Sequence, residues 1–177
     1  FGTAQDHKRV LEGDKGKNTG GMGAYSPSRL ITPELEDKII NKIIKPTLLG
    51  LNELGSTYKG FLYTGLMIIN NEPYLIEYNV RMGDPECQTI LPCLKTDLCE
   101  IFLACCEGNL NKINIEWSNK KSLCVVLCSK GYPETFKKNI EIKNLDKLIL
   151  KNDNFLFHAG TIQENNKVYA VGGRVLN

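Results

Sequence analysis

The sequence predicts an α+β protein, with an antiparallel sheet flanked by helices and then a small β-rich C-terminal part. Three observations lead to this fold class. Residues 32–44 have a helix start followed by apolar residues at helical spacing. Two strand-like runs, 61–69 and 74–79, are separated by turn residues and form a hairpin pattern. Beyond residue 119 the apolar runs become short and are separated by Gly, Asn and Lys.

Two helices have clear boundaries. In the first, Thr32 is a good N-cap, Pro33 suits the first helical position, and acidic residues follow in the first turn. One apolar face then consists of Leu35, Ile39, Ile40, Ile43 and Ile44. Pro46 lacks an amide donor and should kink or end this helix. In the second, Asp97 marks the start, and Gly108 follows Glu107 as the C-terminal stop.

Other segments are defined less sharply. Residues 5–26 are expected to be a loop, charged at first and then rich in glycine. Asp84-Pro85-Glu86 has the order of N-cap, proline and acid that favours a further helix start, before an interruption at Pro92. The polar stretch 109–119 is the best candidate for a domain boundary.

Composition excludes several classes of protein. The 177 residues are 42% hydrophobic and carry a net charge of +2, which is typical of a folded chain. Lys and Arg (22) nearly balance Asp and Glu (20), so neither nucleic acid nor a membrane surface is an expected partner. The seven cysteines include no CxxC pair, and we expect reduced thiols in a reducing, cytoplasmic compartment.

The segment Glu77-Tyr-Asn-Val-Arg-Met-Gly-Asp-Pro-Glu86 could carry chemistry. Side chains alternate along a strand, so Glu77, Asn79 and Arg81 should share one face. A carboxylate beside an amide oxygen suits Mg²⁺, which completes its shell with water and substrate phosphates. Arg81 adds a permanent planar cation for phosphate. The alternative is that these three residues form the solvated face of an amphipathic strand.

A glycine-rich segment, Asn18-Thr-Gly-Gly-Met-Gly-Ala-Tyr-Ser-Pro27, is the second feature. Clustered glycines let backbone amides converge on an anion, but the composition taken alone favours a mobile surface loop. The segment is neither a P-loop nor a dinucleotide-binding turn. Gln5-Asp6-His7-Lys8-Arg9, just before it, places acidic and basic groups together.

The order of these motifs resembles the phosphoribosylamine–glycine ligase family of the ATP-grasp superfamily. The segments that carry the resemblance are 5–9, 18–27, 60–68, 77–86, Gly131-Tyr-Pro133, Phe157-His-Ala-Gly-Thr161 and the final Gly172-Gly-Arg-Val-Leu176. The resemblance implies the C-terminal portion of an ATP-grasp domain over residues 1–113. A small β-rich C-terminal domain, itself incomplete, would follow over 114–177. An N-terminal domain and the first ATP-grasp part would lie outside this chain, which alone should be inactive.

The resemblance also implies a reaction. ATP would drive ligation of glycine to 5-phosphoribosylamine through glycyl phosphate, in purine synthesis, with release of ADP and phosphate. Mg²⁺ or Mn²⁺ would be the cofactor, and all partners would be small molecules. A monomer or a weak dimer is expected. Two alternatives are another ATP-grasp carboxylate–amine ligase and a non-catalytic sugar-phosphate-binding module.

Roles for single residues follow from the same resemblance. Glu77 and Asn79 would bind the metal ion, and Arg81 would neutralise charge on the transferred phosphoryl group. The remaining candidates would hold substrate: Asp6, Lys8, Gly20, Gly21, Met22, Gly83 and Asp84. Many ATP-grasp enzymes carry another acidic ligand on the preceding strand, where the hairpin register predicts Gly65, so the metal shell should be poorer in carboxylate.

Overall fold

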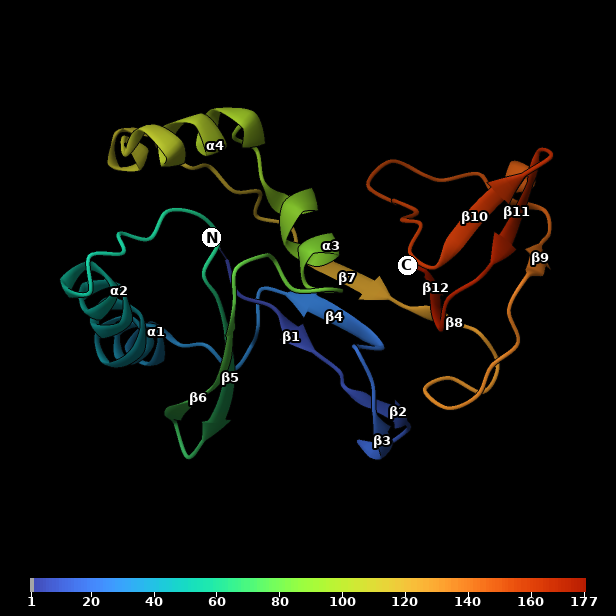
Figure 1. Ribbon diagram of the computed structural model, residues 1–177, viewed down its shortest axis with the longest axis horizontal. Coiled ribbons are helices and arrows are strands. Elements are labelled where there is room, and N and C mark those ends of the chain that lie inside the picture. The colour runs from blue at the N-terminus through green and yellow to red at the C-terminus, as the bar shows by residue number, and fades with distance from the viewer. Residues whose placement is uncertain (1) are drawn as a thin grey trace. The chain divides into compact units, whose positions relative to one another are not determined.

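A computed structural model describes residues 2–177, which form two compact units. Unit 1 contains the chain up to Ser26, together with Asp84–Pro92 and Lys121–Asn177. Unit 2 contains Pro27–Gly83 and Cys93–Lys120. Each unit is described by itself, and the α-helices and β-strands of both are labelled in Figure 1.

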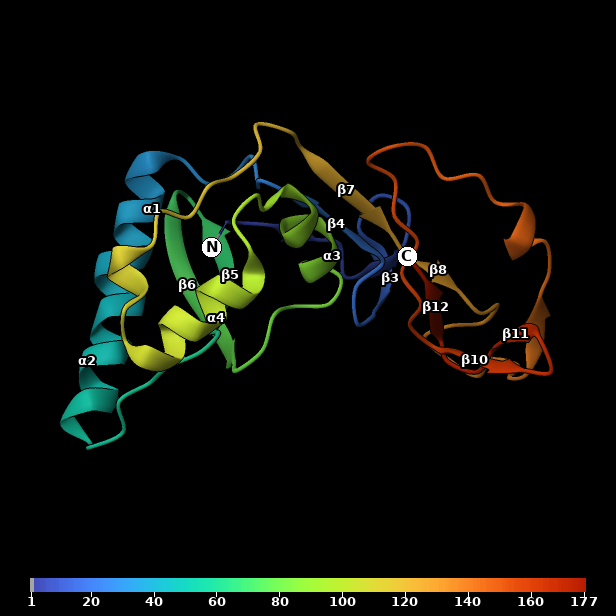
Figure 2. The same ribbon diagram turned by 90° about the horizontal axis from the view of Figure 1, so that it is seen from above.

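Unit 2 begins with the predicted helix. Helix α1 (Pro33–Ile39) starts where the Thr32 hydroxyl accepts a hydrogen bond from the amide of Leu35 at 3.3 Å. Leu35 and Ile39 are buried, and α1 packs against strand β6 (Glu72–Asn79), as Figures 1 and 2 show. The N-cap and the apolar spacing predicted from the sequence are therefore confirmed.

Pro46 does not end the helix. The chain passes from α1 through a π-helical segment, η1 (Ile40–Ile44), into helix α2 (Lys45–Glu53), with Pro46 in its first turn. The wider π turn is a known way to insert a residue into a helix. Pro46 then lies in the first turn of α2, where a backbone amide would have no hydrogen-bond partner within that helix. The expected kink or stop is thus replaced by a change of helical pitch.

The predicted hairpin is present as β5 (Tyr63–Ile69) and β6. Its turn residues, Asn70 and Asn71, have φ angles of 50° and 60°, a region that asparagine tolerates. The antiparallel register pairs Gly65 with Glu77, as expected, and shifts directly after this pair. Pro73, expected in the turn, lies inside β6 and pairs with Ile68.

The second predicted helix completes unit 2. Helix α4 (Leu98–Glu107) starts at Asp97, whose carboxylate accepts from the amides of the next turn, and ends at Gly108 in the left-handed region. Both predicted boundaries are confirmed. The rings of Phe61 and Phe102 meet edge to face, with centroids 5.6 Å apart. The short 3₁₀ segment η3 (Leu110–Lys112) follows α4, and another, η2 (Leu91–Cys93), lies where the chain passes from unit 1 into unit 2.

In unit 1, the segment expected to be a loop contains four strands. These are β1 (Gln5–Asp6), β2 (Arg9–Leu11), β3 (Lys15–Asn18) and β4 (Gly23–Ser26). Strand β4 is the middle strand of a sheet with order β1-β4-β7, in which β7 is Ser122–Val125. The partner β7 lies about a hundred residues away in the sequence, so local composition does not reveal this pairing.

The helix predicted from Asp84 begins later. Helix α3 (Cys87–Ile90) has Glu86 at its N-cap, without a side-chain cap. The Asp84 carboxylate is used elsewhere, because it accepts hydrogen bonds from Gln88 and Arg174. Thr89 and Ile90 of α3 are buried, and the helix packs on β4 and β7.

The C-terminal part of unit 1 is β-rich, as predicted. It contains β8 (Leu127–Cys128), β9 (Ile140–Ile142), η4 (Leu145–Lys147), β10 (Thr161–Glu164), β11 (Lys167–Ala170) and β12 (Arg174–Leu176). The sheets have the orders β10-β11-β9 and β12-β8. Ala170, Val175 and Leu176 form the buried core. Phe155–His158 is no regular strand, although His158 forms a bridge with Leu176.

Two further observations concern the whole described chain. Within residues 2–177, no helix has the length and apolar character required to span a membrane. All seven cysteines are free thiols. The boundary expected between residues 113 and 114 falls inside a segment of unit 2 and stays a prediction.

Candidate functional site

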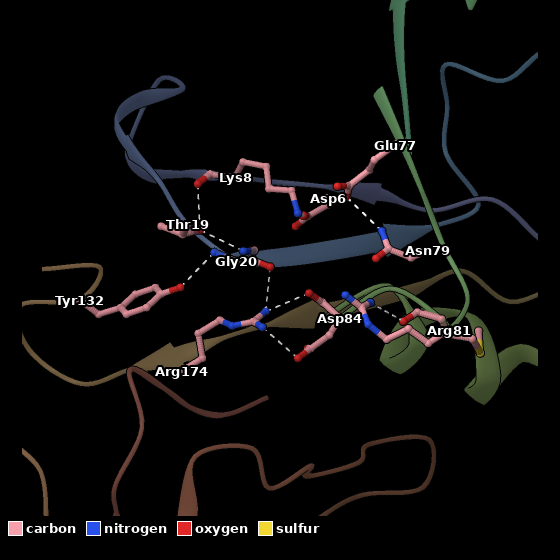
Figure 3. A network of polar contacts seen from close by, with 12 residues as sticks. Asp6, Lys8, Thr19, Gly20, Glu77, Asn79, Arg81, Asp84, Tyr132 and Arg174 are labelled. Carbon is pink, nitrogen blue, oxygen red and sulfur yellow. Dashed lines mark hydrogen bonds and ion pairs between the residues drawn. The ribbon is translucent and has the colours of Figure 1, made fainter. Parts of the chain in front are cut away.

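Glu77 and Asn79 lie together at the end of β6. The Asn79 amide donates to Glu77 Oε1 at 3.2 Å, so the two side chains face each other, as Figure 3 shows. Alternation along the strand explains this neighbourhood, because residues two apart point to the same side. The pair places a carboxylate beside an amide on an accessible strand end. The amide nitrogen faces the carboxylate here, and a half-turn of the amide group would bring its oxygen to the same side.

The neighbouring strand leaves room for this pair. Gly65 is the cross-strand partner of Glu77, and a Cβ at position 65 would lie 3.1 Å from Glu77 Cγ. The described residues contain no group of three or more His, Cys, Asp or Glu side chains able to hold a metal ion. Two oxygen donors fit Mg²⁺ or Mn²⁺, because such ions take the remaining ligands from water and phosphates.

Arg81 departs from the expected arrangement. Strand β6 ends at Asn79, so the alternation that would place Arg81 on the face of Glu77 does not continue to residue 81. The exposed Arg81 guanidinium donates to the carbonyl of Met82 at 2.9 Å. The side chain therefore follows the bend after the strand. Gly83, another candidate, is buried at the end of this segment.

Asp6 and Lys8 form an ion pair in unit 1. The Asp6 side chain is only 8% exposed, whereas Lys8 is half exposed. Burial raises the pKa of Asp6 above its ordinary value; the Lys8 ammonium opposes this rise, and the nearby Glu86 carboxylate adds to it. The two residues expected to work together are thus in direct contact.

The glycine-rich loop lies on this ion pair. Gly21 has φ +119°, and a Cβ there would lie 2.8 Å from Asp6 Oδ1. The loop is held by short backbone bonds, because Met22 N donates to the His7 carbonyl at 2.8 Å. Thr19 N and Oγ1 both donate to the Lys8 carbonyl at 2.8 Å. Four of the candidate residues, Asp6, Lys8, Gly21 and Met22, therefore belong to one continuous structure.

Arg174, in the C-terminal part of unit 1, connects this loop to Asp84. The Asp84 carboxylate accepts from Arg174 Nη2 at 2.9 Å and from Gln88 Nε2 at 3.0 Å. Arg174 Nη1 donates to the carbonyls of Gly20 and Asp84, both at 2.9 Å. In Figure 3, Arg174 stands between Gly20 and Asp84.

Two residues near the loop were not candidates from the sequence. Arg174 and Tyr132 both contact Gly20, and the Tyr132 hydroxyl accepts from the Gly20 amide at 3.0 Å. Only their membership of the motifs Gly131-Tyr-Pro133 and Gly172-Gly-Arg174 could have pointed to them. The contacts themselves join residues more than 100 positions apart, which no local pattern predicts.

The match to family models defines the class of protein. Residues 1–87 match the model for the phosphoribosylglycinamide synthetase ATP-grasp (A) domain, and residues 122–177 match the model for the C domain of the same synthetase. The two models thus describe the ATP-grasp (A) domain and the C domain of one synthetase, and the antiparallel hairpin with its flanking helices agrees with an ATP-grasp fold.

The chain belongs to the phosphoribosylglycinamide synthetase family. It is 46% identical over 177 residues to a phosphoribosylamine–glycine ligase of Brucella melitensis, covering 100% of this chain and 42% of that protein. The corresponding enzyme of Agrobacterium fabrum is 48% identical over 175 residues, covering 99% of this chain and 41% of that protein.

A solved structure agrees with this assignment. The phosphoribosylamine–glycine ligase of Thermotoga maritima matches with a TM-score of 0.81 and 36% identity, covering 98% of this chain and 42% of that one. The chain thus spans about two fifths of the length of these relatives.

Proposed function

We propose that the complete protein ligates glycine to 5-phosphoribosylamine at the expense of ATP, giving glycinamide ribonucleotide, ADP and phosphate in purine biosynthesis. The observation that carries this proposal is the Glu77–Asn79 pair on β6, in a chain similar over its whole length to ligases of that name. Glycine carboxylate would attack the terminal phosphate to give glycyl phosphate. The amine of phosphoribosylamine would then displace the phosphate.

The metal-binding role falls to Glu77 and Asn79. Their oxygen donors suit Mg²⁺ or Mn²⁺, and such an ion neutralises charge on the phosphates of ATP. Gly65 supports the assignment, because any larger residue would crowd the Glu77 side chain. Arg81, which lies two residues after Asn79, would add a permanent positive charge for the phosphoryl group and the acyl phosphate.

The substrate-binding role falls to the loop of unit 1. Gly20 is exposed, Gly21 is buried against Asp6, and Met22 is bound to the His7 carbonyl beside the Asp6–Lys8 ion pair. The charged groups of this pair suit the phosphate and hydroxyl groups of phosphoribosylamine. Gly83 and Asp84 would help to hold substrate. Residues 1–113 would then form the ATP-grasp portion, and 114–177 the small C-terminal domain.

The expected surroundings of the enzyme are also proposals. Small-molecule substrates are its partners, and we infer a monomer or a weak dimer in the cytoplasm. The free thiols of all seven cysteines are compatible with a reducing compartment.

An assay of ADP release by the complete protein tests the function. ADP release should require both glycine and phosphoribosylamine. Glu77→Gln should lower kcat/KM by about 100-fold, because it removes the charged ligand of the metal ion. Glu164→Gln, which removes an exposed carboxylate of strand β10, is the matched control and should be neutral.

Other results of this assay would contradict the metal assignment or indicate another function. Undiminished activity of Glu77→Gln would remove the metal assignment. ADP release that depends on a different amine would indicate another ATP-grasp carboxylate–amine ligase. Binding of a ribosyl phosphate without any ATP-dependent turnover would indicate a sugar-phosphate-binding module.

A further inference from the structure

The peptide groups of Gly20 are held on both sides by the C-terminal part of unit 1. The Gly20 amide donates to the Tyr132 hydroxyl at 3.0 Å, and the Gly20 carbonyl accepts from Arg174 at 2.9 Å. The nearest loop amides, of Gly21 and Met22, are bound instead by Thr19 and His7. Residues from the end of the chain thus complete the hydrogen bonding of a loop at its beginning.

Arg174 binds three oxygens at once. Besides the Gly20 carbonyl, it binds the carbonyl and one carboxylate oxygen of Asp84, all at 2.9 Å. Its side chain is 22% exposed, so solvent weakens these bonds only in part. A planar guanidinium can donate in several fixed directions, whereas a lysine ammonium acts as a point charge. The contact therefore fixes Gly20 relative to Asp84.

Gly20 and Gly173 make this close approach possible. A Cβ at Gly20 would lie 3.0 Å from the Arg174 guanidinium carbon. A Cβ at Gly173 would lie 2.2 Å from the Tyr132 ring, so only glycine leaves room for that ring. Phe136 packs edge to face against the same ring at 6.3 Å between centroids. The tyrosine hydroxyl is thereby directed at the loop by packing.

We propose that Arg174 and Tyr132 are positioning residues that set the conformation of the glycine-rich loop, residues 19–22, for phosphoribosylamine. The role in substrate binding rests on the proposed function. The positioning itself rests only on the contacts within unit 1. Asp84 contributes to the substrate site through Arg174, because its carboxylate is already used by Arg174 and Gln88.

Hydrogen exchange of the complete protein tests the positioning directly. Tyr132→Phe keeps the packed ring and removes only the hydroxyl that accepts from Gly20, so the fold should survive. Peptides covering residues 18–23 should exchange about tenfold faster in Tyr132→Phe and in Arg174→Gln. Lys17→Gln is the matched control, because Lys17 pairs with Glu134 two residues after Tyr132 and does not contact Gly20. Unchanged exchange in Tyr132→Phe and Arg174→Gln would overturn the proposal.

Arg174→Lys separates position from charge. If the planar arrangement of the guanidinium donors is required, residues 18–23 should exchange as fast in Arg174→Lys as in Arg174→Gln. Wild-type exchange in Arg174→Lys would show that charge alone suffices and would overturn the positioning role of the guanidinium.

Kinetics of the same variants test the consequence for the substrate. KM for phosphoribosylamine should rise about tenfold or more, whereas KM for ATP and kcat should stay within about twofold. Equal changes in all parameters would indicate general destabilisation and overturn the substrate-specific role. If the wild-type protein shows no glycine-dependent ADP release, the proposed function is wrong. The exchange measurement would still test whether Tyr132 and Arg174 fix the conformation of the loop.

Discussion

Gly21 lies at the closest approach between the glycine-rich loop and the rest of unit 1. Its φ of +119° belongs to a region that residues with a Cβ rarely adopt. A Cβ would also lie 2.5 Å from Pro85 Cδ, where the buried proline cannot move. Gly21→Ala should therefore destabilise the protein by about 1–3 kcal/mol and lower its Tm by several degrees in thermal unfolding.

Gly50 provides the control for this substitution. It lies in α2, and a Cβ there would have no atom within 4 Å. Gly50→Ala should raise Tm slightly, because alanine favours helix by up to about 1 kcal/mol over glycine. Equal Tm values for the two variants would contradict the steric explanation at Gly21.

The cysteines should differ in reactivity according to burial. Burial raises the pKa of Cys124, and the negative charge of Asp84 adds to the rise, so its thiol stays protonated at neutral pH. Because the thiolate is the nucleophile, iodoacetamide should alkylate Cys124 in the native protein much more slowly than the exposed Cys99. Mass spectrometry after graded labelling at pH 7.5 measures this order, and rapid native labelling of Cys124 would contradict it.

Among the elements, strand β6 is fixed by the residue between its two proposed metal ligands. The Tyr78 hydroxyl lies 2.6 Å from Thr47 Oγ1 and 3.4 Å from the Ile43 carbonyl, both in the helical segment. Alternation directs Tyr78 to the helices and Glu77 and Asn79 to the opposite face. Tyr78 thus anchors the strand that carries the site.

Tyr78→Phe should loosen this anchor. The loss of a partly buried hydrogen bond costs about 1 kcal/mol, which corresponds to roughly fivefold faster exchange of the β5–β6 amides. Tyr74→Phe, on the same strand at a position 53% exposed, should leave the exchange unchanged. Equal effects of the two variants would show that the hydroxyl of Tyr78 does not hold the strand.

Elements with local determinants could be predicted from the sequence. Thr32, Asp97 and Gly108 are capping residues that act within one turn, and the hairpin turn is set by two adjacent asparagines. Strands β1 to β4 could not be predicted in the same way. They are two to four residues long and largely polar, and β4 depends on pairing with the distant β7.

The same distinction applies to the candidate site. The neighbourhood of Glu77 and Asn79 follows from strand alternation, and the pairing of Gly65 with Glu77 follows from hairpin register. Arg81 lies beyond the strand, where alternation no longer holds. The contact of Arg174 with Gly20 spans 154 positions and arises from tertiary packing alone.

At the scale of the whole molecule, this chain contains only part of what its relatives contain. It spans about two fifths of the length of the ligases it resembles, and the two family models together leave residues 88–121 unmatched. The described residues offer Glu77 and Asn79 as the proposed metal donors, with no larger cluster of acidic, histidine or cysteine ligands. A divalent ion held by Glu77 and Asn79 must obtain most of its ligands from outside the described residues, and nucleotide phosphates and water are the ligands that such ions prefer.

Metal binding by the complete protein should therefore depend on nucleotide. Without nucleotide, Mn²⁺ should bind in the millimolar range, because one carboxylate and one amide compensate poorly for the lost hydration of the ion. With ATP, phosphate oxygens complete the shell, and the affinity for Mn²⁺ should rise by about 100-fold or more relative to the binary complex of Mn²⁺ and protein. Electron paramagnetic resonance of free Mn²⁺ measures both values, with Mn²⁺ and ATP alone as the reference. In Glu77→Gln, the affinity for Mn²⁺ in the presence of ATP should fall to that of Mn²⁺ and ATP alone. In Glu164→Gln it should stay at the wild-type value. Tight binding of Mn²⁺ without nucleotide that persists in Glu77→Gln would place the ion elsewhere in the protein.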